Sequence, residues 1–323
     1  MKMKKNILGV DIGGTKCAVI YGQKEGDTLH LVEKVKFPTT SVDETIANIC
    51  SEIEQMMGRH GLDSSNTGAI GISCGGPLDS KRGVVMSPPN LPGWNDIPIV
   101  RMLEERFGIR TGIHNDANAC ALAEWKFGAG VGTQNMVFLT FGTGLGAGLI
   151  LDGKLYAGTN DNAGELGHIR LSEFGPVGYG KCGSFEGFAS GGGIAQLARF
   201  KVSEKQQMGE SVAWCPSGQL DSISAHTVAL AAASGDPLAL EIYRISATYL
   251  GRGLAMVIDL LNPEVIVIGS IYVRNRELME PFVLQEIERE ALSHARRVCS
   301  VRPAKLGEQI GDYAALSVAA NLI

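Results

Sequence analysis

The 323-residue chain has few aromatic residues, no basic excess and no paired cysteines. Aromatic side chains make up 6% of it, and 29 Lys plus Arg against 34 Asp plus Glu give a net charge of −5. Binding to a phosphate backbone needs a cationic surface, so we do not expect a nucleic-acid partner. The seven cysteines are scattered with no C-x-x-C spacing, which favours a reducing, cytoplasmic setting over a disulfide framework.

Long apolar segments are also missing. The uncharged stretch 136–151 is shorter than the roughly 20 residues that span a bilayer, and it contains four glycines. The basic first residues resemble the start of a signal peptide, but Asn6 and Asp11 interrupt the apolar run that should follow. We therefore expect neither a membrane span nor a cleaved leader.

Glycine is the residue in excess. It occupies 42 of 323 positions, about 13% where about 7% is usual, without a Gly-X-Y period. The 45% apolar content excludes a disordered chain, and the length allows two domains that each bury a core. The positions of the glycines therefore direct the search for a site.

Strand-like and helix-like segments alternate in both halves of the chain. The first half predicts strands at 6–11, 17–21, 29–37, 68–74 and 110–114, with helices at 42–58, at 97–107 and from the Asn115-Asp116 pair. The second half predicts strands at 135–140, 147–151, 265–268 and 299–301, with helices at 237–261, at 276–294 and from about 309. The strand–turn–strand beginning occurs twice, which predicts a duplicated α/β fold with its boundary near 115–117.

The first glycine turn, Asp11-Ile-Gly13-Gly14-Thr15-Lys16, directly follows a predicted buried strand. Its glycines would let backbone N–H groups approach a nucleotide phosphate, and Asp11 would reach the water shell of a metal ion. The alternative is a tight hairpin whose glycines only supply positive φ angles. No G-x-x-x-x-G-K-[ST] sequence occurs, so this is not a Walker loop.

The second glycine turn fits the dinucleotide fingerprint G-x-G-x-x-[GA] through Gly142, Gly144 and Ala147. That fingerprint must open a helix, whereas a strand-like segment follows here, so we reject a Rossmann site. We interpret the turn as a second phosphate cradle that pairs with the first across a cleft and is formed by Thr140, Gly142, Thr143 and Gly144.

Acids and amides suited to a sugar follow or precede these turns. Asp116 follows a predicted strand and is a candidate general base for phosphoryl transfer, although the commonest role of Asp at a helix start is capping. Its neighbour Asn115 suits a sugar hydroxyl. Glu165, His168 and Glu186 lie in glycine-rich surroundings and offer acceptors for vicinal hydroxyls, although each acid alone is more typical of a surface or a helix N-terminus. A loop adds the amide of Asn90 and the indole of Trp94.

Six segments in this order resemble the ROK family of sugar kinases and regulators. They are D-I-G-G-T-K at 11–16, C-G-G-P-L-D at 74–79, N-L-P-G-W at 90–94, N-D-A-N-A-C-A-L-A-E at 115–124, L-T-F-G-T-G-L-G-A-G at 139–148 and G-E-L-G-H at 164–168. The resemblance implies the actin-like (ribonuclease H-like) ATPase fold, with two duplicated α/β domains around a cleft. Residues 1–116 and a terminal helix at 304–323 would form one domain, and residues 117–303 the other.

The resemblance also implies roles for the residues above. ATP and Mg²⁺ are the expected cofactors, with Mg²⁺ held by Asp11 through water, and a homodimer is the expected assembly. Asp116 would be the base. The implied sugar contacts are Gly76, Asn90, Asn115, Asp116, Glu165, His168 and Glu186. The implied nucleotide contacts are Asp11, Gly13, Gly14, Thr15, Lys16, Thr140, Gly142, Thr143, Gly144, Gly269 and Ser270.

One segment departs from the family pattern. Family members usually hold zinc with the His of G-E-x-G-H and three cysteines, and here Val177, Tyr179 and Ser184 occupy the cysteine positions. Cys182 falls out of register. Because a tetrahedral structural site needs four ligands, we predict no structural zinc. We expect packing that involves Tyr179 to hold this loop instead.

These features predict an ATP-dependent hexose kinase that phosphorylates a sugar hydroxyl, the 6-OH of glucose or of a related hexose or N-acetylhexosamine. One alternative is a sugar-responsive ROK-type regulator, which carries a helix-turn-helix module where this chain has ten residues before Asp11. Another is an actin-like ATPase without sugar kinase activity, against which the set of Asn90, Glu165, His168 and Glu186 argues.

Overall fold

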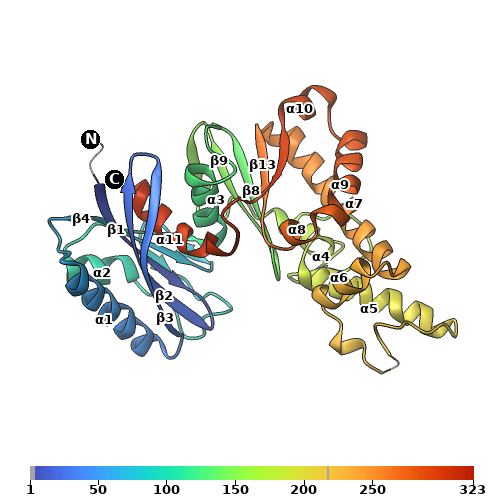
Figure 1. Cartoon of the computed structure of the whole chain (residues 1–323), viewed down its shortest axis with the longest axis horizontal. Coiled ribbons are helices and arrows are strands. Elements are labelled where there is room, and N and C mark those ends of the chain that lie inside the picture. The colour runs from blue at the N-terminus through green and yellow to red at the C-terminus, as the bar shows by residue number, and fades with distance from the viewer. Residues whose placement is uncertain (1–3, 217) are drawn as a thin grey trace. The chain divides into compact units, whose positions relative to one another are not determined.

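Two compact units make up the chain. The computed structural model describes residues 4–216 and 218–323. One unit comprises the residues up to Gln134 together with Gly148–Ala163 and Lys305–Ile323, and the other comprises Asn135–Ala147 and Gly164–Ala304 (Figure 1). Helix α3 (Asp116–Phe127) thus belongs to the first unit, whereas the predicted boundary placed it after the first domain. The predicted division into functional domains stays a prediction.

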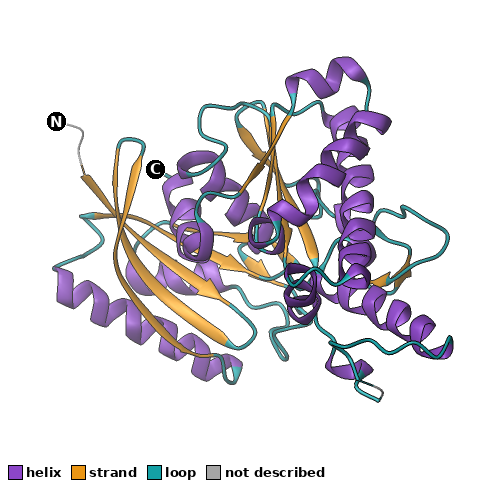
Figure 2. Ribbon diagram, turned by 45° about the vertical axis from the view of Figure 1, so that its right-hand side comes forward, coloured by secondary structure: helices purple, strands orange, loops and turns teal. Residues whose placement is uncertain are grey.

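Two five-stranded sheets of the same topology organise the fold. The first contains β1 (Lys4–Ile12), β2 (Lys16–Glu25), β3 (Thr28–Pro38), β4 (Thr67–Cys74) and β7 (Thr111–Asn115), in the order β3-β2-β1-β4-β7. The second contains β8 (Met136–Phe141), β9 (Leu145–Leu151), β10 (Lys154–Tyr156), β13 (Val265–Ile268) and β14 (Ser300–Pro303), in the order β10-β9-β8-β13-β14. Figure 2 shows the strands in orange among their helices.

The strand directions repeat as well. In the first sheet β2 pairs antiparallel with β3, while β4 runs parallel to both β1 and β7. In the second sheet β9 pairs antiparallel with β10, while β13 runs parallel to both β8 and β14. An antiparallel edge followed by parallel strands with helical crossovers is an α/β arrangement, and its recurrence is the predicted duplication.

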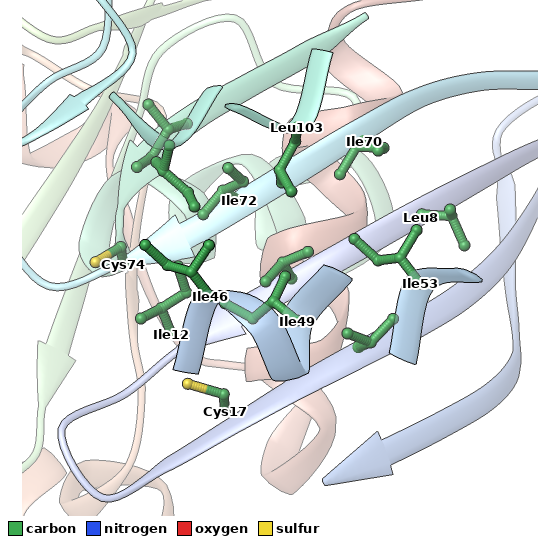
Figure 3. Packing of buried hydrophobic residues seen from close by; sticks show 14 of the residues in the cluster. Leu8, Ile12, Cys17, Ile46, Ile49, Ile53, Ile70, Ile72, Cys74 and Leu103 are labelled. Carbon is green, nitrogen blue, oxygen red and sulfur yellow. The ribbon is translucent and has the colours of Figure 1, made fainter. Parts of the chain in front are cut away.

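The first sheet has helices on both faces. They are α1 (Val42–His60), α2 (Ile99–Phe107) and α11 (Ile310–Asn321), in addition to α3, and two short strands, β5 (Leu78–Asp79) and β6 (Val84–Val85), lie outside the sheet. Apolar residues of α1 recur at helical spacing, so Ile46, Ile49 and Ile53 pack on Leu8 and Ile72 of the sheet (Figure 3). Ser41 caps α1, and Gly61 ends it in the left-handed conformation.

The last helix, α11, covers the other face of the first sheet. A Cβ atom on Gly71 of β4 would lie 2.2 Å from both the Ala315 carbonyl oxygen and the Ala319 nitrogen, so the strand and the helix touch through their backbones. The carboxylate of Glu124, on α3, accepts hydrogen bonds from the backbone N–H groups of Lys305 (3.1 Å) and Leu306 (2.8 Å). Buried backbone donors need such partners, so Glu124 fixes the segment that leads into α11.

The rest of the second unit is mainly helical. Its elements are η1 (Leu166–His168), β11 (Val177–Gly178), β12 (Lys181–Cys182), α4 (Phe185–Phe188), α5 (Gly191–Gln207), α6 (Ala225–Ala233), α7 (Pro237–Leu261), α8 (Ile271–Arg274), α9 (Arg276–Glu290) and α10 (Ser293–Val298). The helix predicted at 276–294 is wrong in extent. It ends at Glu290, because the Leu292 N–H donates to Asp259 Oδ1 of α7 (2.9 Å) and diverts the chain before α10.

Among the residues described, no helix is long and apolar enough to cross a membrane.

Candidate active site

The first glycine turn joins β1 to β2 in the first unit. Gly13 donates to the Lys16 carbonyl oxygen (3.1 Å), and Thr39 Oγ1 donates to the Gly13 carbonyl oxygen (2.6 Å). The turn closes a hairpin of the antiparallel strands β1 and β2, but neither Gly13 nor Gly14 has a positive φ angle, so supplying that conformation is not the reason for these glycines. A Cβ on Gly14 would lie 2.5 Å from the Asn90 carbonyl oxygen, so close packing demands glycine there.

Asn90 lies against two glycine segments at once. Its backbone contacts the Gly14 turn, and its side-chain oxygen would be 3.2 Å from a Cβ on Gly75. A Cβ on the neighbouring Gly76 would lie 4.0 Å from the Asn115 Cβ. The first unit therefore brings the first glycine turn, Asn90, Gly76 and Asn115 together. Trp94 is only 1% exposed and belongs to the core, so the indole supports this loop from beneath and does not offer a sugar contact.

Asn115 and Asp116 occupy the junction of β7 and α3. Asn115 is the N-cap: its side-chain oxygen accepts from the Asn118 N–H (2.7 Å). Asp116 is the first helical residue, and its Oδ1 accepts from the Ala117 N–H (2.8 Å). Within the described chain, Oδ2 of Asp116 accepts from no other residue. The side chain is solvent-accessible, yet the surrounding protein desolvates it and raises the pKa of its carboxyl.

Asp11, one residue before the end of β1, lies in a group of charged side chains of the same unit. Burial, with help from the nearby charge of Asp312, raises the pKa of Asp11 to about 6, and Lys34 opposes this shift. Lys34 Nζ forms an ion pair with the largely buried Asp312 on α11. The charge of Asp116 also raises the pKa of Asp11, so Asp11 and Asp116 are close enough to interact.

The second glycine turn joins β8 to β9 and is tied to Glu186. Gly142 donates to the Gly144 carbonyl oxygen (3.1 Å), and Glu186 Oε2 accepts from the Leu145 N–H (2.9 Å). The Thr140 hydroxyl accepts from the Gly146 N–H (3.0 Å), so it closes the hairpin, while Thr143 is exposed at the turn. The phosphate role of this turn stays a prediction, and Thr143 is better placed for it than Thr140.

The segment that carries Glu165 and His168 packs against the β8–β9 hairpin. A Cβ on Gly164 would be 2.3 Å from the Ala147 carbonyl oxygen, and one on Gly167 would be 2.3 Å from that of Leu145. Gly167 also lies within 3.3 Å, measured the same way, of the Glu186 Cβ. Glycine at these two positions thus lets the second unit gather Glu165, His168 and Glu186, with both Glu165 and His168 exposed.

Gly269 and Ser270 follow β13 and lie near the second turn. A Cβ on Gly142 would be 3.8 Å from Ser270 Oγ. Ser270 has φ 58° and ψ −113°, a conformation that L-residues rarely adopt. Gly191 and Gly192, at the start of α5, are not among the nucleotide contacts predicted from the sequence. Gly191 donates to the Gly142 carbonyl oxygen (2.8 Å) and Gly192 to that of Thr143 (3.2 Å), and the run of three glycines after Ser190 was the available signal.

The segment expected to lack zinc forms the small β11–β12 hairpin. Val177 and Tyr179 lie in the hairpin, Ser184 caps α4, and Cys182 Sγ contacts the Gly175 carbonyl oxygen (3.2 Å). Across residues 4–216 and 218–323, no three or more His, Cys, Asp or Glu side chains converge as metal ligands. The absence of a structural zinc ion stays a prediction.

Known proteins resemble this chain along nearly its whole length. The family model described as the ROK family matches residues 7–321. A glucokinase of Streptomyces coelicolor is 33% identical over 314 residues, 97% of this chain and 96% of that protein. The crystal structure of a ROK family glucokinase from Streptomyces griseus in complex with glucose and AMPPNP is 31% identical, with a TM-score of 0.72 and 98% of each chain covered. The DNA-binding transcriptional repressor Mlc of Escherichia coli is 28% identical over 262 residues, 81% of this chain and 63% of the repressor.

Proposed function

Because the chain belongs to the ROK family and has the actin-like ATPase fold of ROK sugar kinases, we propose that it is an ATP-dependent sugar kinase. It transfers the γ-phosphoryl group of ATP to a hydroxyl of a hexose, the 6-OH of glucose or of a related hexose or N-acetylhexosamine. The glucokinase relatives and the glucose and AMPPNP complex of one of them support this reading.

The observation that carries the proposal is that Asn115 caps α3, which leaves the Asp116 carboxylate without a capping role. Because Asn115 caps α3, Asp116 keeps an oxygen that no other described residue engages, at an accessible position. A carboxylate there can accept the proton of a sugar hydroxyl as its oxygen attacks phosphorus. The raised pKa of Asp116 makes it a stronger base than an ordinary aspartate.

The remaining residues bind and orient. We assign the first turn, Asp11–Lys16, and the second turn, around Thr143 and Gly144, to the phosphates of ATP. We assign the sugar hydroxyls to Gly76, Asn90 and Asn115 of the first unit and to Glu165, His168 and Glu186 of the second. Carboxylate and amide acceptors suit a polyol because an unpaired buried hydroxyl would be costly.

The residues at the first turn fit a magnesium ion. Mg²⁺ prefers oxygen ligands and is usually held by one or two carboxylates together with water and substrate phosphates. Asp11 supplies such a carboxylate at the strand end, and burial without a cation already makes its ionisation costly. When bound, Mg²⁺ neutralises charge on the phosphates. Asp11 would hold it through water.

A coupled assay of ADP release over a panel of hexoses and N-acetylhexosamines tests the proposal. We expect ADP release that depends on the sugar. ADP release without any sugar would favour the ATPase alternative. Sugar binding without turnover would favour a regulator, the function of the Mlc repressor to which the chain is similar. Asp43→Asn is a matched control for Asp116→Asn because it removes an exposed carboxylate from the first turn of another helix, α1. The cytoplasmic location and the homodimer stay predictions.

A further inference from the structure

The β11–β12 hairpin has an unusual residue at its tip. Val177 pairs with Cys182 and Gly178 with Lys181, which leaves Tyr179 and Gly180 as a two-residue turn. Both have positive φ angles, 45° and 75°, as a type I′ turn requires. Asn or Gly usually fills the first of these positions, and a bulky residue there is a conformational outlier. The turn itself therefore gives no reason for a tyrosine.

The contact that Tyr179 makes suggests a reason. Its side chain is 80% exposed, yet its ring lies 6.1 Å from the imidazole of His168, centroid to centroid, at an interplanar angle of 77°. This is the edge-to-face geometry that aromatic rings prefer. His168 is itself exposed, so the tyrosine ring restricts an imidazole that would otherwise rotate in solvent.

Lys181, on the second strand of the hairpin, holds the same residue from the backbone side. Its Nζ donates to the His168 carbonyl oxygen at 2.7 Å. Gly178, on the first strand, has no room for a side chain, since a Cβ there would be 2.9 Å from the Glu186 Cβ and 2.7 Å from the Gly187 nitrogen. The hairpin thus touches both His168 and the element that carries Glu186.

The base of the hairpin is fixed by a side-chain amide. Gln196 of α5 accepts from the Val177 N–H (3.0 Å) and donates to the Val177 carbonyl oxygen (2.8 Å), as a neighbouring strand would. Arg170 Nη1 adds a bond to the Cys182 carbonyl oxygen (2.8 Å). Because α5 also contacts the second glycine turn through Gly191, α5 connects the hairpin to that turn within one unit.

We propose that Tyr179 and Lys181 are positioning residues for the sugar site: the hairpin, clamped by Gln196, sets the orientation of His168 toward the sugar. The proposal rests on the proposed function, and it names the residues on which the affinity of that site for its sugar depends. They act through His168 and need not touch the substrate.

Steady-state kinetics of four variants tests this role. Tyr179→Ala and Lys181→Met should each raise the KM for the sugar about two- to tenfold, the range that the loss of one aromatic pair or one hydrogen bond implies, while kcat and the KM for ATP stay near the wild-type values. Tyr179→Phe keeps the ring and should restore the wild-type KM. Phe174→Ala is the matched control, because Phe174 is an 84% exposed aromatic residue of the same segment.

A readout independent of activity accompanies the kinetics. In histidine-labelled protein, the ring protons of His168 should carry a ring-current shift that Tyr179→Ala removes and Tyr179→Phe preserves, with His168→Gln providing the assignment. The proposal is overturned if the His168 signal of Tyr179→Ala is the same as that of the wild type. It is also overturned if the signal moves but the KM for the sugar stays at the wild-type value. If the wild-type protein phosphorylates no sugar, the proposed function fails, but the positioning role can still be tested by calorimetric measurement of sugar binding. An unchanged Kd for the sugar in Tyr179→Ala would then overturn the positioning role.

Discussion

The side-chain oxygen of Asn115 accepts the Asn118 N–H at 2.7 Å, so Asn115 and not Asp116 caps helix α3. Helix capping and the proposed proton transfer therefore belong to two different residues. An oxygen committed to capping is a weaker base, whereas Oδ1 of Asp116 accepts from its neighbour Ala117 and Oδ2 accepts from no other described residue. The pair therefore links the local structure of the helix start to the proposed chemistry.

Replacing the cap should separate stability from sugar binding. Asn115→Ala is expected to lower the free energy of unfolding by about 1 kcal/mol, because one helix N–H loses its acceptor. Asn115→Ser restores a capping oxygen and should recover that stability, while the KM for the sugar stays raised because the amide is gone. Urea unfolding and kinetics of the two variants check this. Equal stability of both variants would contradict the capping role.

The pH dependence of activity should show an acidic limb that belongs to Asp116. The base works when ionised and burial raises its pKa, so kcat/KM should fall as the pH drops through a value above the ordinary 3.8. A pH–rate profile from pH 4 to 9 measures the limb. An activity that stays flat down to pH 4 would argue against Asp116 as the base.

The same shift has a consequence for stability. Since the folded-state pKa is raised, the contribution of Asp116 to stability is complete below the unfolded pKa and is lost as the pH rises through the folded value. Asp116→Asn cannot ionise, so its Tm should exceed that of the wild type at pH 8 and approach it near pH 3.8. Differential scanning calorimetry at both pH values measures the difference, and a lower Tm for the variant at pH 8 would contradict this reading.

Close packing at the first turn can be probed with one methyl group. Gly14→Ala would place a Cβ 2.5 Å from the Asn90 carbonyl oxygen, and we expect a loss of about 1–3 kcal/mol in stability together with raised KM values for ATP and sugar. Gly58→Ala, in helix α1 with nothing within 4 Å, should instead add about 0.5–1 kcal/mol. Unfolding and kinetics of both variants test this, and a Gly14→Ala protein as stable and active as the wild type would refute the close contact.

Removal of metal ions should affect catalysis and leave the fold intact. Val177, Tyr179 and Ser184 are not the usual ligands of zinc, and hydrogen bonds from Gln196 and Lys181 hold the segment. After treatment with EDTA the Tm should stay the same, and Mg²⁺ alone should restore activity. Elemental analysis that found stoichiometric zinc, with a fall in Tm on chelation, would show that the zinc prediction is wrong.

Much of the fold is visible in local sequence patterns. The period-2 and period-3.6 patterns place β1, β4, α1 and α7 correctly, because each element buries a continuous apolar face and carries its own end signals, such as Ser41 before α1 and Asn262 after α7. The break between α9 and α10 was not predictable, because it depends on Asp259, more than thirty residues away. Helix α5 was missed because three glycines open it, although Ser190 caps it.

The candidate site divides in the same way. Motifs name Asp116, Glu186 and the two turns, because each depends on residue types at short spacing. The contacts that orient them are long-range: Asn90 against Gly14, Leu145 against Glu186 and Lys181 against His168. No periodicity encodes such contacts, so the sequence could suggest only that Tyr179 helps to hold its loop, and the structure adds the His168 contact and the Gln196 clamp.

The central claim is that this chain moves a phosphoryl group from ATP to a sugar hydroxyl with Asp116 as the base. The most direct measurement follows ADP and sugar phosphate together, by coupled assay and phosphorus NMR, for the wild type and Asp116→Asn with Mg²⁺ and the best hexose of the panel. We predict equal amounts of the two products, a kcat lower by at least roughly 10² in the variant, and sugar affinity close to the wild-type value. ADP formed without sugar phosphate, or near-normal turnover in Asp116→Asn, would contradict the account.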